Sequence, residues 1–114
     1  MADAPPDPAG KWLAEDIAGG GVIDRLQTTL EIEGTGAFGK GGCNRYGSTV
    51  KIDGDRLTFT PAVSTRMACA PAIMEQERKF LDALGKVRGW ETARSKLVLL
   101  DGSGKPVLTF SPLD

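Results

Sequence analysis

Two cysteines, Cys43 and Cys69, are the sequence feature that most constrains the fold. Cys43 lies in the glycine-rich segment 41–47, and Cys69 ends the segment 64–69. Two unbonded cysteines can simply be small buried side chains. The even count favours one disulfide, and the absence of a CxxC spacing or a nearby histidine argues against redox or metal work. Closing this loop would stabilise the domain by about 3.5 kcal/mol in the chain-entropy model.

Length and composition predict one ordinary globular domain. The chain has 114 residues, a formal net charge of -1, 25% charged residues and 40% hydrophobic residues, so no nucleic-acid partner or charged membrane surface is indicated. Its longest apolar run, 97–100, is far shorter than the roughly 20 residues of a membrane span, so no transmembrane segment is predicted in this chain. We expect a disordered lead-in over 1–10, which holds three prolines, and a single domain over 11–114.

Alternating apolar residues predict a mostly antiparallel sheet. The clearest hairpin joins 48–52 to 56–60 through the turn 53–55. Its apolar residues should share one buried face: Val50, Ile52, Leu57 and Phe59. Other strands are expected at 11–17, 22–24, 28–33, 87–92, 96–100 and 105–111.

One helix is predicted over 71–85. Pro71 suits a first helical turn, Gly85 supplies a stop, and Glu75 and Glu77 would suit the positive end of the helix dipole. A stripe of residues at helical spacing should face the sheet: Ile73, Met74, Glu77, Phe80, Leu81 and Leu84. The predicted fold class is therefore α+β: a compact, mostly antiparallel sheet or partly closed β-barrel with one α-helix packed across it.

No group of residues indicates catalysis. The chain contains no histidine, which excludes histidine-based triads, proton relays and histidine metal sites. The carboxylate pair Glu31 and Glu33 fits a solvated strand face, and Glu75 with Glu77 fits a helix terminus. We therefore predict no enzyme activity, no catalytic residue, no cofactor and no metal ligand.

Two loop motifs resemble ligand sites but are better explained as turns. Residues 34–40 match GxxxxGK, yet Gly41 replaces the Ser or Thr of a phosphate-binding loop and no helix follows, which favours a glycine-rich hairpin. Residues 101–105 lack the final glutamate of a calcium loop and should form a hairpin turn. The aromatic residues Trp12, Phe38, Tyr46 and Trp90 are predicted to lie in the core rather than to stack on bases.

The motifs nevertheless indicate a family. The residues GCNRYG at 42–47 and TRMAC at 65–69, followed by a helix, make the chain similar to the META domain, also called HslJ-like, over nearly its whole length from Trp12 to Phe110. The residues that carry the resemblance are Trp12, Gly42, Asn44, Arg45, Tyr46, Gly47, Thr65, Met67, Glu77 and Phe80. Backbone groups in such glycine-rich loops need partners, so Asn44, Arg45 and Thr65 should hold the two cysteine loops through side-chain hydrogen bonds.

The resemblance implies a bacterial envelope protein, often a lipoprotein, that is associated with heat or antibiotic stress rather than with catalysis. The lipid-attachment cysteine of lipoprotein members is missing, and Trp90 stands where a less defined aromatic is usual. Residues 1–10 lack the pattern of a signal peptide, so the protein is either cytosolic or has lost an export signal or anchor, and a disulfide favours the periplasm or cell envelope.

Two functions follow as expectations. The first is a non-catalytic module that binds another envelope protein. The alternative is a small-molecule or lipid-binding β-barrel, which would have an apolar cavity lined by Phe38, Phe59 and Trp90. A filled interior with an exposed apolar patch would favour the first.

Overall fold

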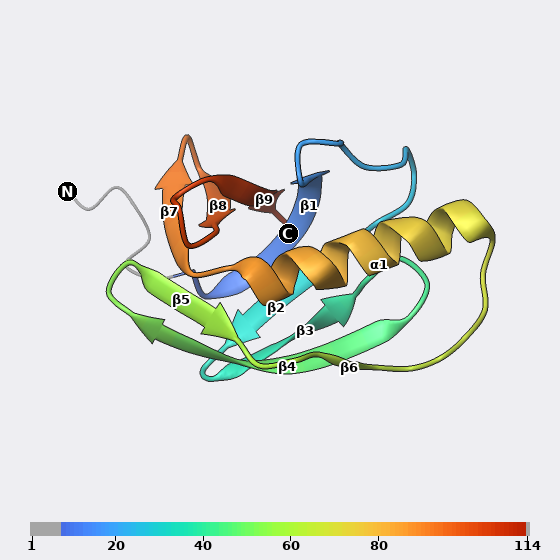
Figure 1. Cartoon of the computed structure of the whole chain (residues 1–114), viewed down its shortest axis with the longest axis horizontal. Helices are drawn as coiled ribbons and strands as arrows, with labels where there is room; N and C mark the ends of the chain where they lie inside the picture. Colours follow the sequence, from blue (N-terminus) through green and yellow to red (C-terminus); the bar gives the residue numbers. More distant parts are fainter. Residues whose placement is uncertain (1–7, 114) are drawn as a thin grey trace.

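A computed structural model describes residues 8–113, which form nine strands and one helix (Figure 1). The strands are β1 (Gly10–Ile17), β2 (Thr29–Glu33), β3 (Gly36–Lys40), β4 (Arg45–Asp53), β5 (Arg56–Phe59), β6 (Val63–Ser64), β7 (Gly89–Ala93), β8 (Lys96–Leu100) and β9 (Pro106–Pro112). The helix α1 (Pro71–Lys86) lies between β6 and β7 in the sequence. The α+β class predicted from the sequence is confirmed.

The sheet is antiparallel and closes into a ring. Its strand order is β3-β2-β1-β9-β8-β7-β5-β4, and β4 pairs back onto β3. The short β6 continues along β4 beyond the end of β5. The shortest strand pairing in the ring is between β5 and β7, where Arg56 is aligned with Gly89. At this pairing the Leu57 N–H donates to the Arg88 carbonyl at 3.1 Å. Ring closure pairs strand edges that an open sheet would leave free.

Strand alternation places the apolar residues inside this ring. In β2, Leu30 and Ile32 are buried, whereas Glu33 is exposed. The β4–β5 hairpin turns at 53–55 as predicted and pairs Val50 with Phe59. The same register pairs Ile52 with Leu57, so the predicted shared face is confirmed.

The helix packs against β1, β5 and β9, and Phe80 is the largest side chain on its buried face. The Phe80 ring is fully buried and makes edge-to-face contacts with Tyr46 at 5.4 Å and Phe110 at 6.3 Å between ring centroids. Such pairs add to the stabilisation that burial alone provides. Tyr46 belongs to β4 and Phe110 to β9, two strands on opposite sides of the ring (Figure 1). The Phe80 side chain therefore connects these two parts of the sheet.

The buried face of α1 differs from the predicted stripe. Its buried residues are Gln76, Glu77, Phe80, Ala83 and Leu84. Three residues that were expected to face the sheet are only partly buried: Ile73, Met74 and Leu81. Gln76 takes a buried position because its side chain finds hydrogen-bond partners there, so polarity alone does not identify the outer face.

Two predicted boundaries are wrong. Residues 22–24 form no strand and belong to the loop between β1 and β2, which is held by Asp16, whose carboxylate accepts the N–H groups of Gly19 at 2.8 Å and Gly21 at 2.7 Å. Val87 closes the helix by donating its N–H to the Leu84 carbonyl at 3.2 Å, so β7 begins only at Gly89. Both differences arise from local hydrogen bonds that hydrophobic periodicity does not encode.

The lead-in predicted over 1–10 overlaps the described part of the chain at residues 8–10. Residues 1–7 lie outside the described residues. Pro8 is buried, and its carbonyl accepts the indole N–H of Trp12 at 2.9 Å. The strand β1 starts at Gly10, one residue before the strand predicted over 11–17.

The predicted turns form as expected. Residues 34–40 are a tight turn followed by β3, not a loop leading into a helix. At 101–105 the Asp101 carboxylate accepts the N–H groups of Ser103 at 2.9 Å and Lys105 at 3.0 Å. The hydrogen bond from the Ser103 hydroxyl, at 2.8 Å, is the main reason that the pKa of Asp101 lies below its usual value. The carboxylate therefore stabilises a hairpin turn.

The aromatic prediction holds for three of its four residues. Trp12 and Tyr46 are buried, and the half-buried Trp90 donates its indole N–H to the Gly54 carbonyl at 2.7 Å. Phe38 is 39% exposed, so its assignment to the core was wrong. It occupies an outward position of β3, because its neighbour Ala37 takes the buried one.

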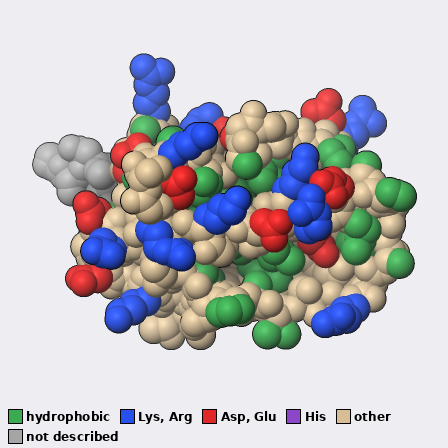
Figure 2. Space-filling view, viewed as in Figure 1, with side chains coloured by type: hydrophobic (Ala, Val, Ile, Leu, Met, Phe, Trp, Pro, Cys, Tyr) green, Lys and Arg blue, Asp and Glu red, His purple; other side chains and the backbone are tan. Residues whose placement is uncertain are grey.

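The surface mixes both signs of charge. On the face that Figure 2 shows, basic and acidic side chains alternate and hydrophobic side chains appear between them. Within residues 8–113, no helix is both long and apolar enough to cross a bilayer.

Candidate functional site

The predicted disulfide joins the two signature segments. Cys43 follows β3, Cys69 precedes α1, and their Cα atoms lie 6.1 Å apart across a sequence separation of 26. Cys43 is buried, whereas Cys69 is exposed. The bond ties the entry of β4 to the entry of the helix.

Glu77 lies beneath this crosslink and binds the backbone around Cys43. Its Oε1 accepts the N–H groups of Cys43 at 2.9 Å and Asn44 at 2.5 Å, and its Oε2 accepts the Asn44 amide Nδ2 at 2.8 Å. Burial raises the pKa of Glu77, but the hydrogen bonds from Asn44 and Cys43 outweigh it and hold the pKa below its usual value. The carboxylate is therefore ionised at neutral pH.

The dipole interpretation of the two helical glutamates was wrong. The first turn of α1 contains no acidic residue. Glu75 is exposed and pairs with Arg78 at 2.6 Å, whereas Glu77 is 6% exposed and faces inward. Their positions fall on different sides of the helix because they are two residues apart.

Asn44 connects the cysteine loops through its side chain. Its Oδ1 accepts the N–H of Met67 at 2.6 Å and the hydroxyl of Thr65 at 2.8 Å, and its Nδ2 also donates to the Met67 carbonyl at 3.2 Å. The Thr65 hydroxyl oxygen accepts the Arg45 N–H at 3.2 Å. The predicted structural role is confirmed for Asn44 and Thr65.

Arg45 does not have the predicted role. Its side chain is exposed, and within residues 8–113 only its backbone takes part in holding the loops, through the Thr65 hydroxyl and N–H. The side chain points outward because it follows the buried Asn44 and precedes the buried Tyr46 on an alternating strand.

Glycines let the cysteine loop approach the helix. A Cβ atom on Gly41 would lie 2.9 Å from Cγ of Glu77. Gly42 has a φ of +147°, and a Cβ there would lie 3.4 Å from the Ile73 carbonyl oxygen. Glycine at these two positions therefore lets the backbone N–H groups of the loop come close enough to donate to Glu77.

The remaining signature residues fall into two groups. Trp12, Tyr46 and Phe80 are buried in the core, and Tyr46 donates its hydroxyl to the Thr29 carbonyl at 2.6 Å. Gly47 and Met67 instead face solvent: Met67 is 56% exposed, and a Cβ on Gly47 would meet nothing within 4 Å. Tyr46 is largely buried, which raises its pKa and keeps the hydroxyl protonated as a donor.

An outer face lies across β3, β4 and β6. Phe38 is directly opposite Gly47, which is directly opposite Val63, so all three point to the same side of the sheet. Phe38 is 39% exposed and Val63 is 78% exposed. Gly47 leaves the space between them open. We call this row of three positions the outer patch.

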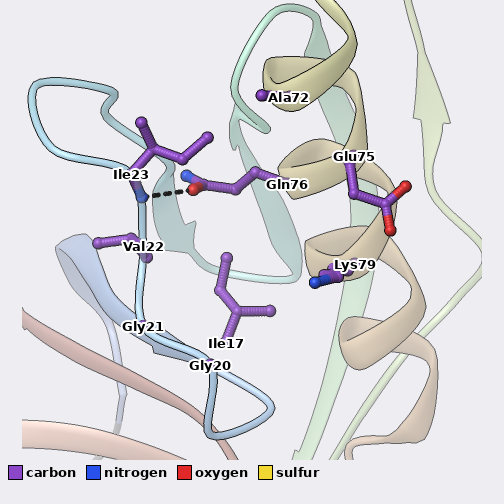
Figure 3. A pocket seen from close by; sticks show the side chains of 9 residues that line it. All are labelled: Ile17, Gly20, Gly21, Val22, Ile23, Ala72, Glu75, Gln76 and Lys79. Carbon is purple, nitrogen blue, oxygen red and sulfur yellow. Dashed lines mark hydrogen bonds between the residues drawn. The ribbon is translucent and has the colours of Figure 1, made fainter.

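A groove separates α1 from the loop after β1 (Figure 3). It consists of a hollow of about 210 Å³ and a second of about 340 Å³, which share Ile17, Gly20 and Lys79. In Figure 3 the side chain of Ile17 lies between loop and helix, and Glu75 points away from the loop. We call this feature the helix groove.

Gln76 fixes the loop that forms one wall of the helix groove. Its Oε1 accepts the Ile23 N–H at 2.7 Å, drawn as a dashed line in Figure 3. Its Nε2 donates to the hydroxyl oxygen of Thr28 at 3.0 Å, and Thr28 donates to the Gly41 carbonyl at 3.0 Å. Gln76 and Thr28 were not identified from the sequence as residues that hold this loop. A polar residue at position 76, one turn before Phe80 on the buried face of the helix, was the signal that could have indicated it.

The ring of antiparallel strands, the single helix and the crosslinked junction define a small disulfide-bonded α+β domain. The family profile of the META domain matches residues 7–113. The chain therefore belongs to the META domain family, as its signature residues indicated. No curated protein matches the chain.

Two solved structures have the same fold. One, described as an NMR structure of a protein, has a TM-score of 0.71 and 21% identity, with 96% of this chain and 95% of that chain covered. The other, an NMR structure of a protein from Burkholderia xenovorans, has a TM-score of 0.71 and 24% identity, with 97% and 93% covered. At these identities the likeness establishes the fold alone.

Proposed function

We propose that this META domain is a non-catalytic interaction module of the bacterial cell envelope that serves in the response to heat or antibiotic stress. It binds another envelope protein through the outer patch. The observation that carries the proposal is the exposed pair Phe38 and Val63 on either side of the uncovered Gly47.

Exposure of these side chains is informative because they are grouped. Single apolar residues on a surface need no explanation. Phe38 and Val63, however, lie in one cross-strand row, and the exposed Met67 follows on the same segment as Val63. A partner side chain seated over Gly47 would contact both.

The charges beside the outer patch favour a partner with acidic groups. Lys40 and Arg45 are directly opposite each other on β3 and β4, and both side chains are exposed. Within residues 8–113 neither takes part in an ion pair. Like charges directly opposite each other repel, so a carboxylate from a partner would relieve that repulsion.

A binding rather than catalytic role is supported by how the buried carboxylate is used. Glu77 accepts three hydrogen bonds from Cys43 and Asn44. If its carboxylate took up a proton during catalysis, the bonds that hold the cysteine loop on the helix would be lost. The absence of histidine from the sequence removes the commonest general base.

The disulfide supports an envelope location. Cys69 is exposed, and glutathione and thioredoxin would keep such a pair reduced in the cytosol. The stress-related part of the proposal is supported by the resemblance of the signature residues to the META family.

An interior ligand site receives less support. Phe38 is on the outer face, while Phe59 and Trp90 pack against the core, so these three side chains do not line one cavity. Phe80, Tyr46 and Phe110 are packed against one another inside the ring.

Cross-linking in envelope extract tests the outer patch. The double variant Phe38→Ser/Val63→Ser should lose the partner that wild type captures, because it removes the apolar contacts. Ile23→Ser is the matched control, since Ile23 is also 39% exposed but lies in the loop after β1. Equal capture by wild type and the double variant would contradict the proposal.

A second variant tests the same site without removing an apolar group. Gly47→Thr adds a side chain between Phe38 and Val63, where the structure leaves open space. We expect an unchanged or slightly raised melting temperature, because threonine suits a strand better than glycine. Capture of the partner should fall, and undiminished capture would exclude Gly47 as part of the contact.

A further inference from the structure

We propose that the helix groove binds a small anionic amphiphile, a monomeric acid with a carboxylate-like head and a short apolar chain. This site lies between α1 and the loop after β1, whereas the outer patch lies on β3, β4 and β6. The inference therefore does not depend on the proposed partner.

The floor of the helix groove is apolar. Ile17 from β1, Ala83 from α1 and Val107 from β9 line it, and they are 3%, 4% and 8% exposed. The larger hollow, at about 340 Å³, lies at the lower end of the roughly 300–1,000 Å³ range of small-molecule sites. An apolar chain laid on this floor would be removed from water.

The rim of the helix groove is cationic. Lys79 and Lys86 line it from one side of α1, about 10 Å apart along the helix axis. Neither lysine has an ion-pair partner among residues 8–113. Two positive charges above an apolar floor match an anionic head on an apolar chain.

Arg78 holds the two carboxylates near the rim in ion pairs of their own. Glu75 and Asp82 both border the groove. Glu75 pairs with Arg78 at 2.6 Å and Asp82 pairs with it at 3.0 Å. The single charge of Arg78 offsets only one of the two acids, so the rim of Lys79, Lys86, Arg78, Glu75 and Asp82 keeps a net charge of +1, which favours an anionic head.

The loop wall is held in place before any ligand arrives. Asp16 accepts the N–H groups of Gly19 and Gly21, and Gln76 accepts the N–H of Ile23. A preformed wall reduces the entropy that binding would otherwise lose.

An NMR titration of the whole chain tests the site with octanoate, and octylammonium serves as the control of equal chain length and opposite charge. Octanoate should shift the amide signals of residues 20–23 and 79–86 and leave those of Phe38 and Val63 in place. Octylammonium should bind about 5-fold more weakly or worse, as expected when exposed ion pairs are lost. Equal binding of the two probes, or shifts confined to the outer patch, would overturn the proposal.

Variants separate the lysines from general charge effects. Lys79→Met/Lys86→Met should weaken octanoate binding by about 5- to 10-fold, since two exposed ion pairs are lost. Lys51→Met/Lys105→Met makes the same change in net charge at exposed positions outside the groove and should leave binding unchanged. Equal weakening in both variants would overturn the site. Binding to phosphatidylglycerol vesicles through residues 20–23, without binding of octanoate, would replace the monomeric acid by a lipid surface.

Discussion

At the scale of single residues, the contact between α1 and the loop around Cys43 depends on a few atoms that complete one another's hydrogen bonds. Glu77 supplies the acceptors, the backbone of Cys43 and Asn44 supplies the donors, and two glycines allow the close approach. Buried carboxylates are tolerated when their hydrogen bonds are complete. We therefore expect each of these residues to contribute more to the free energy of unfolding than its size suggests.

Replacing Glu77 should make stability less dependent on acid. The folded pKa of Glu77 lies below its unfolded value of about 4.3, so its contribution is complete above pH 5 and is lost as pH falls through the folded pKa. Glu77→Gln should lower the free energy of unfolding by about 1–3 kcal/mol at pH 7. Urea unfolding at several pH values measures this.

The difference in the free energy of unfolding between wild type and Glu77→Gln isolates the contribution of Glu77 at each pH. Glu15, Glu75 and Asp101 also have lowered pKa values, but they remain in both. The difference in stability should therefore shrink toward low pH. A difference that stays constant from pH 7 to pH 3 would contradict an ionised Glu77 in the folded protein.

Glycine at 42 should be required, and glycine at 47 should not. Gly42 has φ +147° and faces the backbone of Ile73 at close range, so Gly42→Ala should destabilise the domain by about 1–3 kcal/mol. Gly47→Ala is the matched control in open space and should change stability by less than about 1 kcal/mol. Thermal unfolding measures both, and equal losses would contradict a special backbone requirement at Gly42.

At the scale of elements, the helix organises two loops at once. Its inner face holds the cysteine loop through Glu77 and the loop after β1 through Gln76. Phe80, one turn later, packs into the ring between Tyr46 and Phe110. A polar pair followed by an aromatic therefore defines how α1 is oriented on the sheet.

Removing the Gln76 side chain should release the loop after β1. Gln76→Ala leaves the Ile23 N–H and the Thr28 hydroxyl without their partner, so amide exchange at 19–24 should accelerate and stability should fall by about 1–3 kcal/mol. Gln27→Ala is the control, because Gln27 is exposed. Unchanged exchange at Ile23 in Gln76→Ala would mean that the loop is held elsewhere.

At the scale of the whole molecule, stability rests on ring closure and on the Cys43–Cys69 crosslink. Reduction should lower the free energy of unfolding by about 2–5 kcal/mol, the usual effect of removing a native disulfide from a small domain. The fold should persist, because β3 still pairs with β4 and Glu77 still holds the loop. Denaturant unfolding with and without reductant measures the effect.

Thiol titration under denaturing conditions gives the independent check. Protein isolated without reductant should have no free thiol, and Cys43→Ala/Cys69→Ala should match the stability of the reduced wild type. Two free thiols in protein isolated from its natural compartment would remove the crosslink, and with it the main support for an envelope location.

The sequence by itself was sufficient for what depends on neighbours along the chain. Alternation placed Leu57 opposite Ile52, turn chemistry placed the hairpins at 53–55 and 101–105, and helical spacing placed Phe80 in the core. The cysteine count predicted the disulfide, and the motifs predicted the family. The strand, turn and helix predictions follow from periods of two and 3.6 residues and from local backbone preferences.

Only the tertiary structure decided what depends on residues far apart in sequence. The exposed Phe38 contradicts its predicted core position, and the buried Gln76 was not part of the predicted buried stripe of the helix. Neither is a local property: Phe38 is outward because β3 takes its register from β2 and β4, and Gln76 is buried because Ile23 and Thr28 supply its partners. Closure of the ring, the helix groove and the outer patch arise in the same way, because register and long-range hydrogen bonds are fixed only when the strands meet.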